Sequence, residues 1–268
     1  MIDGEIGMKY QLIVSTMRQD DDSLIKKMNI NSNAIIINQS NKVSYHETSI
    51  RDYIVKWFEF NERGIGMSRN SGLMRADAEI IQFADDDMVF TDTYMKDVLD
   101  EYEKHPEADV ILFSNRCLNV ERMPYRVDEF ARVGRIEGVK FGGARITARR
   151  EKILYNNIYF SLLFGGGACY GAGEDVTFVQ DCIKAGLKVY KSPVIVSTMK
   201  QESSTWFNGY DKKYFKDKGA LLYANFPLVA SIGIYIQAFK KRKASNFSYK
   251  ELVSFYKEGA DEYKNGKK

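Results

Sequence analysis

Three consecutive carboxylates, Asp85, Asp86 and Asp87, follow directly on the apolar run Glu79–Ala84. Neighbouring carboxylates repel one another, and a divalent cation is the usual compensation. Mg²⁺ or Mn²⁺ needs only one or two protein carboxylates when substrate phosphates supply further oxygens. The triplet therefore indicates a metal-assisted phosphate site. The alternative is a solvated acidic turn that precedes a helix beginning near Thr91.

A second acidic group, Glu174 and Asp175, follows Gly171-Ala172-Gly173. The pattern after it predicts a helix that ends at Gly186, so both carboxylates stand in the first helical turn. The helix dipole favours acids there, which makes simple capping one interpretation. The other is a general base that the helix N-terminus presents to a hydroxyl group.

A cation, Arg69, lies in the glycine-containing segment Arg63–Leu73 (RGIGMSRNSGL). This segment lacks the GxGxxG spacing of a dinucleotide site, and the chain contains no GxxxxGK[ST] sequence of a P-loop. Arg69 could bind a diphosphate at the start of a helix, or it could be an exposed side chain of a turn. Further on, Trp206 in the sequence ESSTW could stack on a sugar ring or belong to the core.

The elements that must position these residues alternate between strands and helices. That alternation predicts an α/β fold with one mostly parallel sheet, in which ligands bind at the carboxyl ends of the strands. The aspartate triplet lies at such an end. The expected strands are Tyr10–Thr16, Ala34–Asn38, Val55–Phe60, Glu79–Ala84 and Asp109–Phe113, and the expected helices are Leu24–Met28, Thr48–Tyr53, Ser71–Ala78 and Thr91–Lys104.

The second half of the chain is less regular. The pattern weakens from Arg116 to Phe164, which indicates a loop-rich half rather than a second doubly wound domain. Order returns with the helix that follows Gly173. Two further strands are expected at Lys188–Tyr190 and Val194–Thr198, on either side of Pro193.

Length and composition set outer limits on function. A chain of 268 residues with a net charge of +3 suits one domain with an appendage and argues against a dedicated nucleic-acid binder. Three cysteines without CxxC spacing and two histidines make a zinc site unexpected, and they favour a reducing compartment. The first residues lack the basic and apolar regions of a signal peptide. A cytoplasmic protein is therefore expected.

The C-terminal region differs from the rest. Residues 219–239 carry no formal charge, and Lys240-Lys241-Arg242-Lys243 follows at once. Residues 240–268 have a net charge of +5, which leaves −2 for the remainder of the chain. Three interpretations are open: a transmembrane span kinked at Pro227, a helix pair on the surface of an anionic membrane, and a helix docked on the catalytic body.

Together, these segments resemble the family 2 glycosyltransferases of GT-A fold. RGIGMSRNSGLMRADAEIIQFADDD is similar to the family's segment before its metal-binding DxD acids, and GAGEDVTFVQDCIKAGLKV is similar to its "ED" motif, about ninety residues further on. The likeness covers about residues 8–206. It implies a GT-A domain over 8–215, with a nucleotide-sugar half (8–113) and an acceptor half (114–215). A C-terminal helical segment (216–268) would follow, for which binding to a membrane surface and packing on the catalytic domain both stay open.

The resemblance also implies roles for single residues. Asp175 would be the catalytic base with Glu174 beside it, and Trp206 would be a platform for the acceptor or sugar. The family commonly has an Asp after the second strand, where this chain has Asn38-Gln39, so the nucleobase is left open. Asp87 and Asp85 would bind Mn²⁺ or Mg²⁺, and the donor would contact Ser15, Thr16, Asn38, Gln39, Arg69, Asp85 and Asp86.

The implied activity is an inverting, metal-dependent transfer of a sugar from a nucleotide sugar, expected to be a UDP-sugar, to a hydroxyl of a glycan or lipid-linked glycan. The ESSTW sequence resembles the branch that makes bacterial cell-surface polysaccharides, at the inner face of the plasma membrane. One alternative is a sugar-1-phosphate nucleotidyltransferase, which usually has a glycine-rich basic loop where Ser15–Asp22 has no glycine. Another is a nucleotide-sugar-binding module without catalysis.

Overall fold

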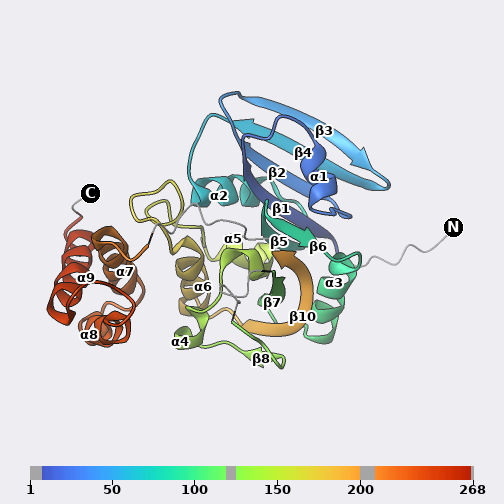
Figure 1. The fold of residues 1–268 in the computed structure, drawn as a ribbon. Coiled ribbons are helices and arrows are strands. Elements are labelled where there is room, and N and C mark those ends of the chain that lie inside the picture. The colour runs from blue at the N-terminus through green and yellow to red at the C-terminus, as the bar shows by residue number, and fades with distance from the viewer. Residues whose placement is uncertain (1–7, 119–124, 200–208, 267–268) are drawn as a thin grey trace.

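A single mixed sheet forms the centre of the molecule. The computed structural model describes residues 8–118, 125–199 and 209–266 (Figure 1). The strands lie in the order β3-β4-β2-β1-β5-β9-β7-β10-β6, and β8 also pairs with β10. Four neighbouring strands in the first half are parallel: β4 (Tyr53–Phe60), β2 (Ala34–Gln39), β1 (Tyr10–Met17) and β5 (Ile80–Asp85). The predicted α/β class with a mostly parallel sheet is confirmed.

The other half of the sheet comes from the less regular part of the sequence. β9 (Ile146–Arg149) is antiparallel to both β5 and β7 (Val110–Cys117), and so joins the two halves. β10 (Val189–Met199) is one strand parallel to β7, although two were predicted; the register shifts around Pro193 without ending the strand. Two short strands, β6 (Met88–Phe90) and β8 (Ala131–Arg132), pair with β10 in antiparallel fashion.

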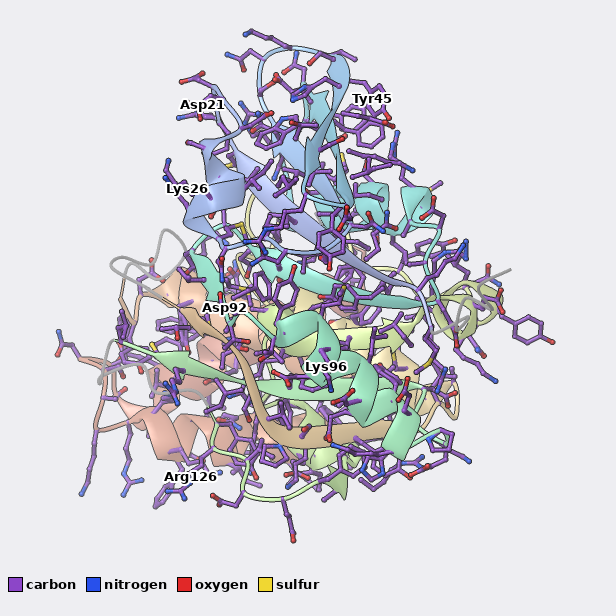
Figure 2. The ribbon with its side chains drawn as sticks, turned by 90° about the vertical axis from the view of Figure 1, so that its right-hand side faces the viewer. Asp21, Lys26, Tyr45, Asp92, Lys96 and Arg126 are labelled. Carbon is purple, nitrogen blue, oxygen red and sulfur yellow. The ribbon has the colours of Figure 1, made fainter. Side chains whose placement is uncertain are left out.

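Helices cover both faces of the sheet, because alternate side chains of the buried strands point to opposite sides. Leu12 and Val14 pack with α1 (Ser23–Lys27) and α3 (Tyr94–Lys104). Ile13 and Ile35 pack on the other face, where α2 (Ile65–Arg75), α5 (Arg150–Tyr155) and α6 (Glu174–Lys184) lie. Figure 2 shows α3, with Lys96 on the side of the helix that faces away from the sheet. The short elements α4 (Arg135–Gly138) and η2 (Gly143–Arg145) lie between β8 and β9 in the chain.

The helix predicted over Thr48–Tyr53 is wrong. These residues belong mainly to β3 (Ser44–Ile50), which forms an antiparallel hairpin with β4 at the edge of the sheet. Arg51 adopts a φ of 54° in the turn between the two strands. The β-branched residues Thr48 and Ile50 favour the extended conformation. Most side chains of β3 are exposed, so the strand does not show the alternation of buried and exposed residues that is typical of a half-buried strand.

The second helix, α2, begins at Ile65 rather than at the predicted Ser71. Gly64 starts it with a φ of 136°, which side-chain-bearing residues rarely adopt. Gly66 and Gly72 were interpreted as loop and helix-start residues, but both lie inside the helix against neighbouring chain segments. A Cβ atom on Gly66 would lie 2.5 Å from the carbonyl oxygen of Ser161. These glycines allow close packing, and they place Arg69 within the helix.

Three helices follow the sheet: α7 (Lys212–Asn225), α8 (Ala230–Lys241) and α9 (Tyr249–Lys264). They share a small core, and α7 and α9 cross closely where Gly219 and Gly259 face each other's backbone. Within the three described ranges, no helix has the length and apolar composition needed to cross a membrane. The helical conformation is interrupted between α7 and α8 around Pro227, so residues 219–239 form parts of two helices. α7 extends across residues 215 and 216, and the domain boundary there stays a prediction.

Candidate active site

A cleft of about 890 Å³ opens at the carboxyl ends of β1, β2, β5 and β7. Nine of the residues predicted for the site from sequence line it together, from both halves of the chain. This position agrees with the general rule for parallel sheets. The nine residues are Ser15, Thr16, Gln39, Arg69, Asp85, Asp86, Asp87, Glu174 and Asp175, and the segment Gly171–Gly173 completes the wall.

Arg69 connects the two acidic groups. Its Nη2 atom lies 2.7 Å from Asp85 Oδ1, and its Nη1 atom lies 2.8 Å from Glu174 Oε1. The side chain is only 3% exposed, and its guanidinium lies 5.2 Å from the centre of the Phe160 ring. Burial alone would lower the pKa of Arg69, but Asp85, Glu174 and the nearby Asp175 outweigh that effect and raise it. Arg69 is therefore permanently charged and holds both carboxylates in place.

Two glycines make room for this arrangement. A Cβ atom on Gly143 would lie 2.6 Å from the Arg69 guanidinium, and one on Gly165 would lie 2.7 Å from Glu174 Oε2. Both distances are shorter than any non-bonded contact between such atoms. The pairing of Arg69 with Glu174 therefore requires glycine at positions 143 and 165, because a side chain at either position would overlap one of the paired groups.

The three aspartates have different surroundings. Asp85 pairs with Arg69, and Asp86 Oδ2 accepts a hydrogen bond of 2.6 Å from Thr16 Oγ1. Asp87 forms neither an ion pair nor a hydrogen bond with another described residue. Burial, followed by the charges of Asp85 and Asp86, raises the pKa of Asp87 to about 6. Asp87 is thus the carboxylate of the triplet with the most to gain from a cation.

The acidic residues of the cleft can hold a divalent metal only together with ligands from a substrate. Across the described ranges, no three His, Cys, Asp or Glu side chains form a group that could hold a metal ion by themselves. Mg²⁺ and Mn²⁺ sites for nucleotide substrates need fewer, since one or two carboxylates act together with phosphate oxygens. Asp87, with its uncompensated carboxylate, and Asp85 beside it fit that incomplete type of site.

Glu174 and Asp175 are adjacent but face different surroundings. Glu174 is buried, and its Oε2 atom accepts a hydrogen bond of 3.2 Å from the backbone N–H of Gly173. Burial and the charge of Asp175 raise the pKa of Glu174, and Arg69 opposes that rise. Asp175 is half-buried at the cleft wall, where its Oδ2 atom accepts a hydrogen bond of 3.1 Å from the Gly143 N–H. Glu174 thus fixes Arg69, whereas Asp175 is accessible to a substrate.

The cleft's other end is polar and is held by contacts of α2 and its N-terminal Gly64 with β1 and β2. Ser68 Oγ donates a hydrogen bond of 2.9 Å to Ser15 Oγ, and the N–H of Gly64 donates one of 2.7 Å to Gln39 Oε1. Asn38, predicted to bind the donor, does not line the cleft. Its side chain is fully buried and exchanges hydrogen bonds with the backbone of Gln19. It fixes the loop after β1. Trp206 lies outside the described residues.

Several cleft residues in the second half of the chain were not predicted from sequence. Asn115, Cys117, Tyr125, Lys140 and Arg145 line the cleft opposite Ser15 and Gln39. Four of them come from the stretch in which the periodic pattern weakens, and Asn115 lies just before it, near the end of β7. The one available signal was Gly142-Gly143 next to a basic residue, a combination that suits close backbone approach to a charged group.

Helix α7 supports the loop that carries the second acidic group. Asp217 Oδ2 accepts a hydrogen bond of 2.8 Å from the N–H of Gly171. Gly173 adopts a φ of 118°, and a Cβ atom there would lie 2.5 Å from Leu221 Cδ1. The C-terminal helices therefore pack directly behind Glu174 and Asp175.

A cleft at the strand ends of a parallel sheet, lined by the aspartate triplet and a Glu-Asp helix start, is the arrangement that the resemblance to GT-A glycosyltransferases predicts. The comparisons with known proteins support that class. The sequence profile described as Glycosyl transferase family 2 matches residues 23–170, more than half of the chain. The chain belongs to this family. No curated protein matches its sequence significantly.

Solved structures show the same fold at low sequence identity. Residues 1–349 of TarS from S. aureus align with a TM-score of 0.62 and 14% identity, covering 97% of this chain and 92% of that one. The complex of the same protein with UDP-GlcNAc gives 0.61 and 13%, with the same coverage. The mannosyltransferase PcManGT from Pyrobaculum calidifontis, in complex with GDP-Man and Mn²⁺, gives 0.56 and 10%, covering 98% of this chain and 89% of that one.

Proposed function

We propose that this glycosyltransferase catalyses a metal-dependent, inverting transfer of a sugar from a nucleotide sugar to a hydroxyl group of a glycan or lipid-linked glycan. The observation that carries the proposal is the double ion pair of Arg69 with Asp85 and Glu174. It fixes the carboxylates beside the donor diphosphate at a set position relative to Asp175. Charge neutralisation and proton removal thereby occur in one cleft.

In the proposed reaction, Asp87 and Asp85 hold Mn²⁺ or Mg²⁺. When bound, the metal makes the diphosphate a better leaving group by neutralising its charge. Asp175 accepts the proton of the acceptor hydroxyl as its oxygen attacks the anomeric carbon. The Gly143 N–H keeps the Asp175 carboxylate oriented. A single displacement inverts the configuration and needs no carboxylate nucleophile, in contrast to retaining hydrolysis.

The proposed donor is a UDP-sugar, with Ser15, Thr16 and Gln39 on the nucleoside side of the cleft. Support comes from the TarS structures, which include complexes with UDP and UDP-GlcNAc. PcManGT carries GDP-Man instead, so both bases belong in the binding experiment. The proposed role in cell-surface polysaccharide synthesis rests on the sequence resemblance.

The test is release of the nucleotide from UDP-sugars and GDP-sugars with Mn²⁺, with and without glycan acceptors. Asp175→Asn should leave donor binding nearly unchanged and lower turnover about 10²–10⁴-fold, the usual contribution of a general base. Asp181→Asn, on the exposed side of the same helix, is the matched control. Wild-type turnover in Asp175→Asn would exclude it as the base. Binding without any turnover in the wild type would support a module without catalysis.

A second experiment concerns the metal. Asp87→Ala should abolish the gain in nucleotide affinity that Mn²⁺ provides in titration calorimetry, while leaving metal-free binding of UDP or GDP in place. The exposed Asp77 pairs only with Lys56 at the surface, so Asp77→Ala is a suitable control. An unchanged Mn²⁺ effect in Asp87→Ala would contradict the proposed ligand.

We also propose that helix α8 binds an anionic membrane surface, which would bring the cleft to lipid-linked acceptors. Ile232, Tyr235, Ile236 and Phe239 are 45–64% exposed and lie on one side of α8, at the spacing of an amphipathic helix. The basic run Lys240–Lys243 follows. It forms no ion pair with a described carboxylate, so its charge is available to lipid headgroups.

Co-sedimentation with liposomes tests this surface. Binding to vesicles containing phosphatidylglycerol should fall strongly in the double variant Ile232→Gln/Ile236→Gln, and vesicles of phosphatidylcholine alone should bind weakly. Ile136→Gln, at an 83% exposed position on α4, is the control. Unchanged sedimentation of the double variant would refute the proposal. A dimer in gel filtration that the double variant dissociates would assign this face to a second copy of the chain instead.

A further inference from the structure

Two buried arginines line the cleft, and they differ in what they contact. Arg69 is paired with two carboxylates. Arg145 is 4% exposed, yet its side chain forms no ion pair and no hydrogen bond with any residue that the structure describes. Its Nη1 atom is enclosed and has no partner. Its guanidinium lies 5.4 Å from the centre of the Phe141 ring.

The backbone around Arg145 is fixed. The residue ends η2, where Asn115 Nδ2 donates a hydrogen bond of 3.1 Å to the carbonyl oxygen of Ala144. Asn115 is itself held by Ser197, whose Oγ atom donates a hydrogen bond of 3.1 Å to Asn115 Oδ1. The next residue, Ile146, begins β9 in the middle of the sheet. Arg145 is thus presented to the cleft by a rigid support.

Burying a cation without a partner raises the free energy of the folded state, because a charge removed from water normally needs an opposite charge or full hydrogen bonding. Burial alone lowers the pKa of Arg145 to about 10, and no carboxylate opposes that effect. The group nevertheless stays protonated at neutral pH. A permanently charged group without a protein partner, in a substrate cleft, is the arrangement expected where the substrate itself brings the anion.

The position of Arg145 indicates which part of the substrate that is. In the sheet order, β9 and β7 lie beyond β5, on the side away from β1 and β2, where the nucleoside is proposed to bind. Arg145 stands two residues after Gly143, whose N–H binds Asp175 Oδ2, so it follows the segment that holds the proposed base. It therefore lies beyond the diphosphate-binding acids of β5 as seen from the nucleoside, on the side toward which the donor's sugar would extend.

We propose that Arg145 binds a carboxylate on the donor's sugar ring, so that this enzyme transfers an acidic sugar, such as a hexuronic acid. The sugar is the part of the donor that lies past the diphosphate as seen from the nucleoside. It is also bound deeper than an acceptor that enters at the cleft mouth, which suits a residue as buried as Arg145. The planar guanidinium can bind a carboxylate through two parallel hydrogen bonds. This inference rests on the proposed nucleotide-sugar function of the cleft.

The test compares matched pairs of donors by titration calorimetry with Mn²⁺: UDP-glucose against UDP-glucuronate, and GDP-mannose against GDP-mannuronate, with UDP and GDP alone as references. In the series whose base binds, the wild type should bind the uronate about 10–100-fold more tightly than the neutral sugar, as a buried hydrogen bond to a charged group allows. Arg145→Gln should abolish that preference and leave the affinity for the nucleotide alone unchanged. Arg145→Lys should retain part of it.

Arg126→Gln, at an exposed arginine paired with Asp128, is the control and should behave like the wild type. A wild type that binds the neutral sugar as tightly as the uronate would overturn the inference, whatever the variants do. So would an Arg145→Gln variant that loses equal affinity for the uronate, the neutral sugar and the nucleotide alone, since that would place the diphosphate at Arg145. If neither nucleotide binds to the wild type, the proposed function itself fails, and this inference fails with it.

Discussion

Replacing Gly143 by alanine tests whether the Arg69 ion pair depends on the bare backbone beside it. The new Cβ atom would lie 2.6 Å from the guanidinium, against about 3.5 Å for a relaxed contact, so the two groups must separate by about 0.9 Å. Arg69 has little freedom to move, because Asp85 and Glu174 hold its two terminal nitrogens. Overpacking of this kind typically costs about 1–3 kcal/mol, and we expect that loss in the free energy of unfolding.

Urea denaturation with a matched glycine isolates the effect. Gly134→Ala introduces the same methyl group where nothing lies within 4 Å, so it should be neutral or slightly stabilising. In an Arg69→Met background the guanidinium is gone, and Gly143→Ala should then cost at least about 1 kcal/mol less than in the wild type. The reasoning is refuted if Gly143→Ala matches Gly134→Ala, or if the effects of Gly143→Ala and Arg69→Met simply add.

Three further predictions concern other parts of the molecule. Because burial and its acidic neighbours raise the pKa of Asp87 to about 6, the folded state binds this proton more tightly than the unfolded state, and stability falls as pH rises from about 4 to 6. Asp87→Asn should therefore stabilise the metal-free protein at pH 7 but not at pH 4, in thermal unfolding with a chelator; equal effects at both pH values would contradict this. Asn70→Ala should cost about 2–4 kcal/mol in urea unfolding, since its side chain bonds both the N–H and the carbonyl of Phe160 at 2.8 Å; a loss below about 0.5 kcal/mol would show that water replaces it. Gly259→Ala should lower the melting temperature by several degrees, because its Cβ would overlap the backbone carbonyl of Lys216 where no side chain can yield; a melting temperature within a degree of the wild type would show that α7 and α9 can separate cheaply.

The acidic residues could be predicted from sequence because each group sits at the end of a strongly patterned local element. The apolar run before Asp85 and the amphipathic helix after Asp175 define their positions without any tertiary information. Arg69 was recognised, but its function depends on Glu174, 105 residues further on, which no local pattern reveals. The strand β3 was missed because its hairpin is largely exposed and lacks clear alternation.

Arg145 illustrates the limit of sequence reasoning most directly. What distinguishes it is the absence of a partner in the described part of the chain, and this depends on how η2, β7 and β9 pack. An isolated arginine after two glycines gives no sign of burial. The fold class and the acidic half of the site were therefore predictable, whereas the basic side of the cleft required the arrangement of the sheet.

The Arg69 pairs also have a consequence for how the chain acquires its structure. Asp85 follows Arg69 by 16 residues, whereas Glu174 belongs to the other half of the chain. During synthesis, Arg69 can meet Asp85 early, but it gains its second carboxylate only after α6 has emerged and docked. Contacts between such distant residues form late, because the intervening chain must first be ordered. Residues 8–113 alone would keep a half-satisfied buried charge, so we expect this segment and the one that carries α6 to fold and unfold as one cooperative unit.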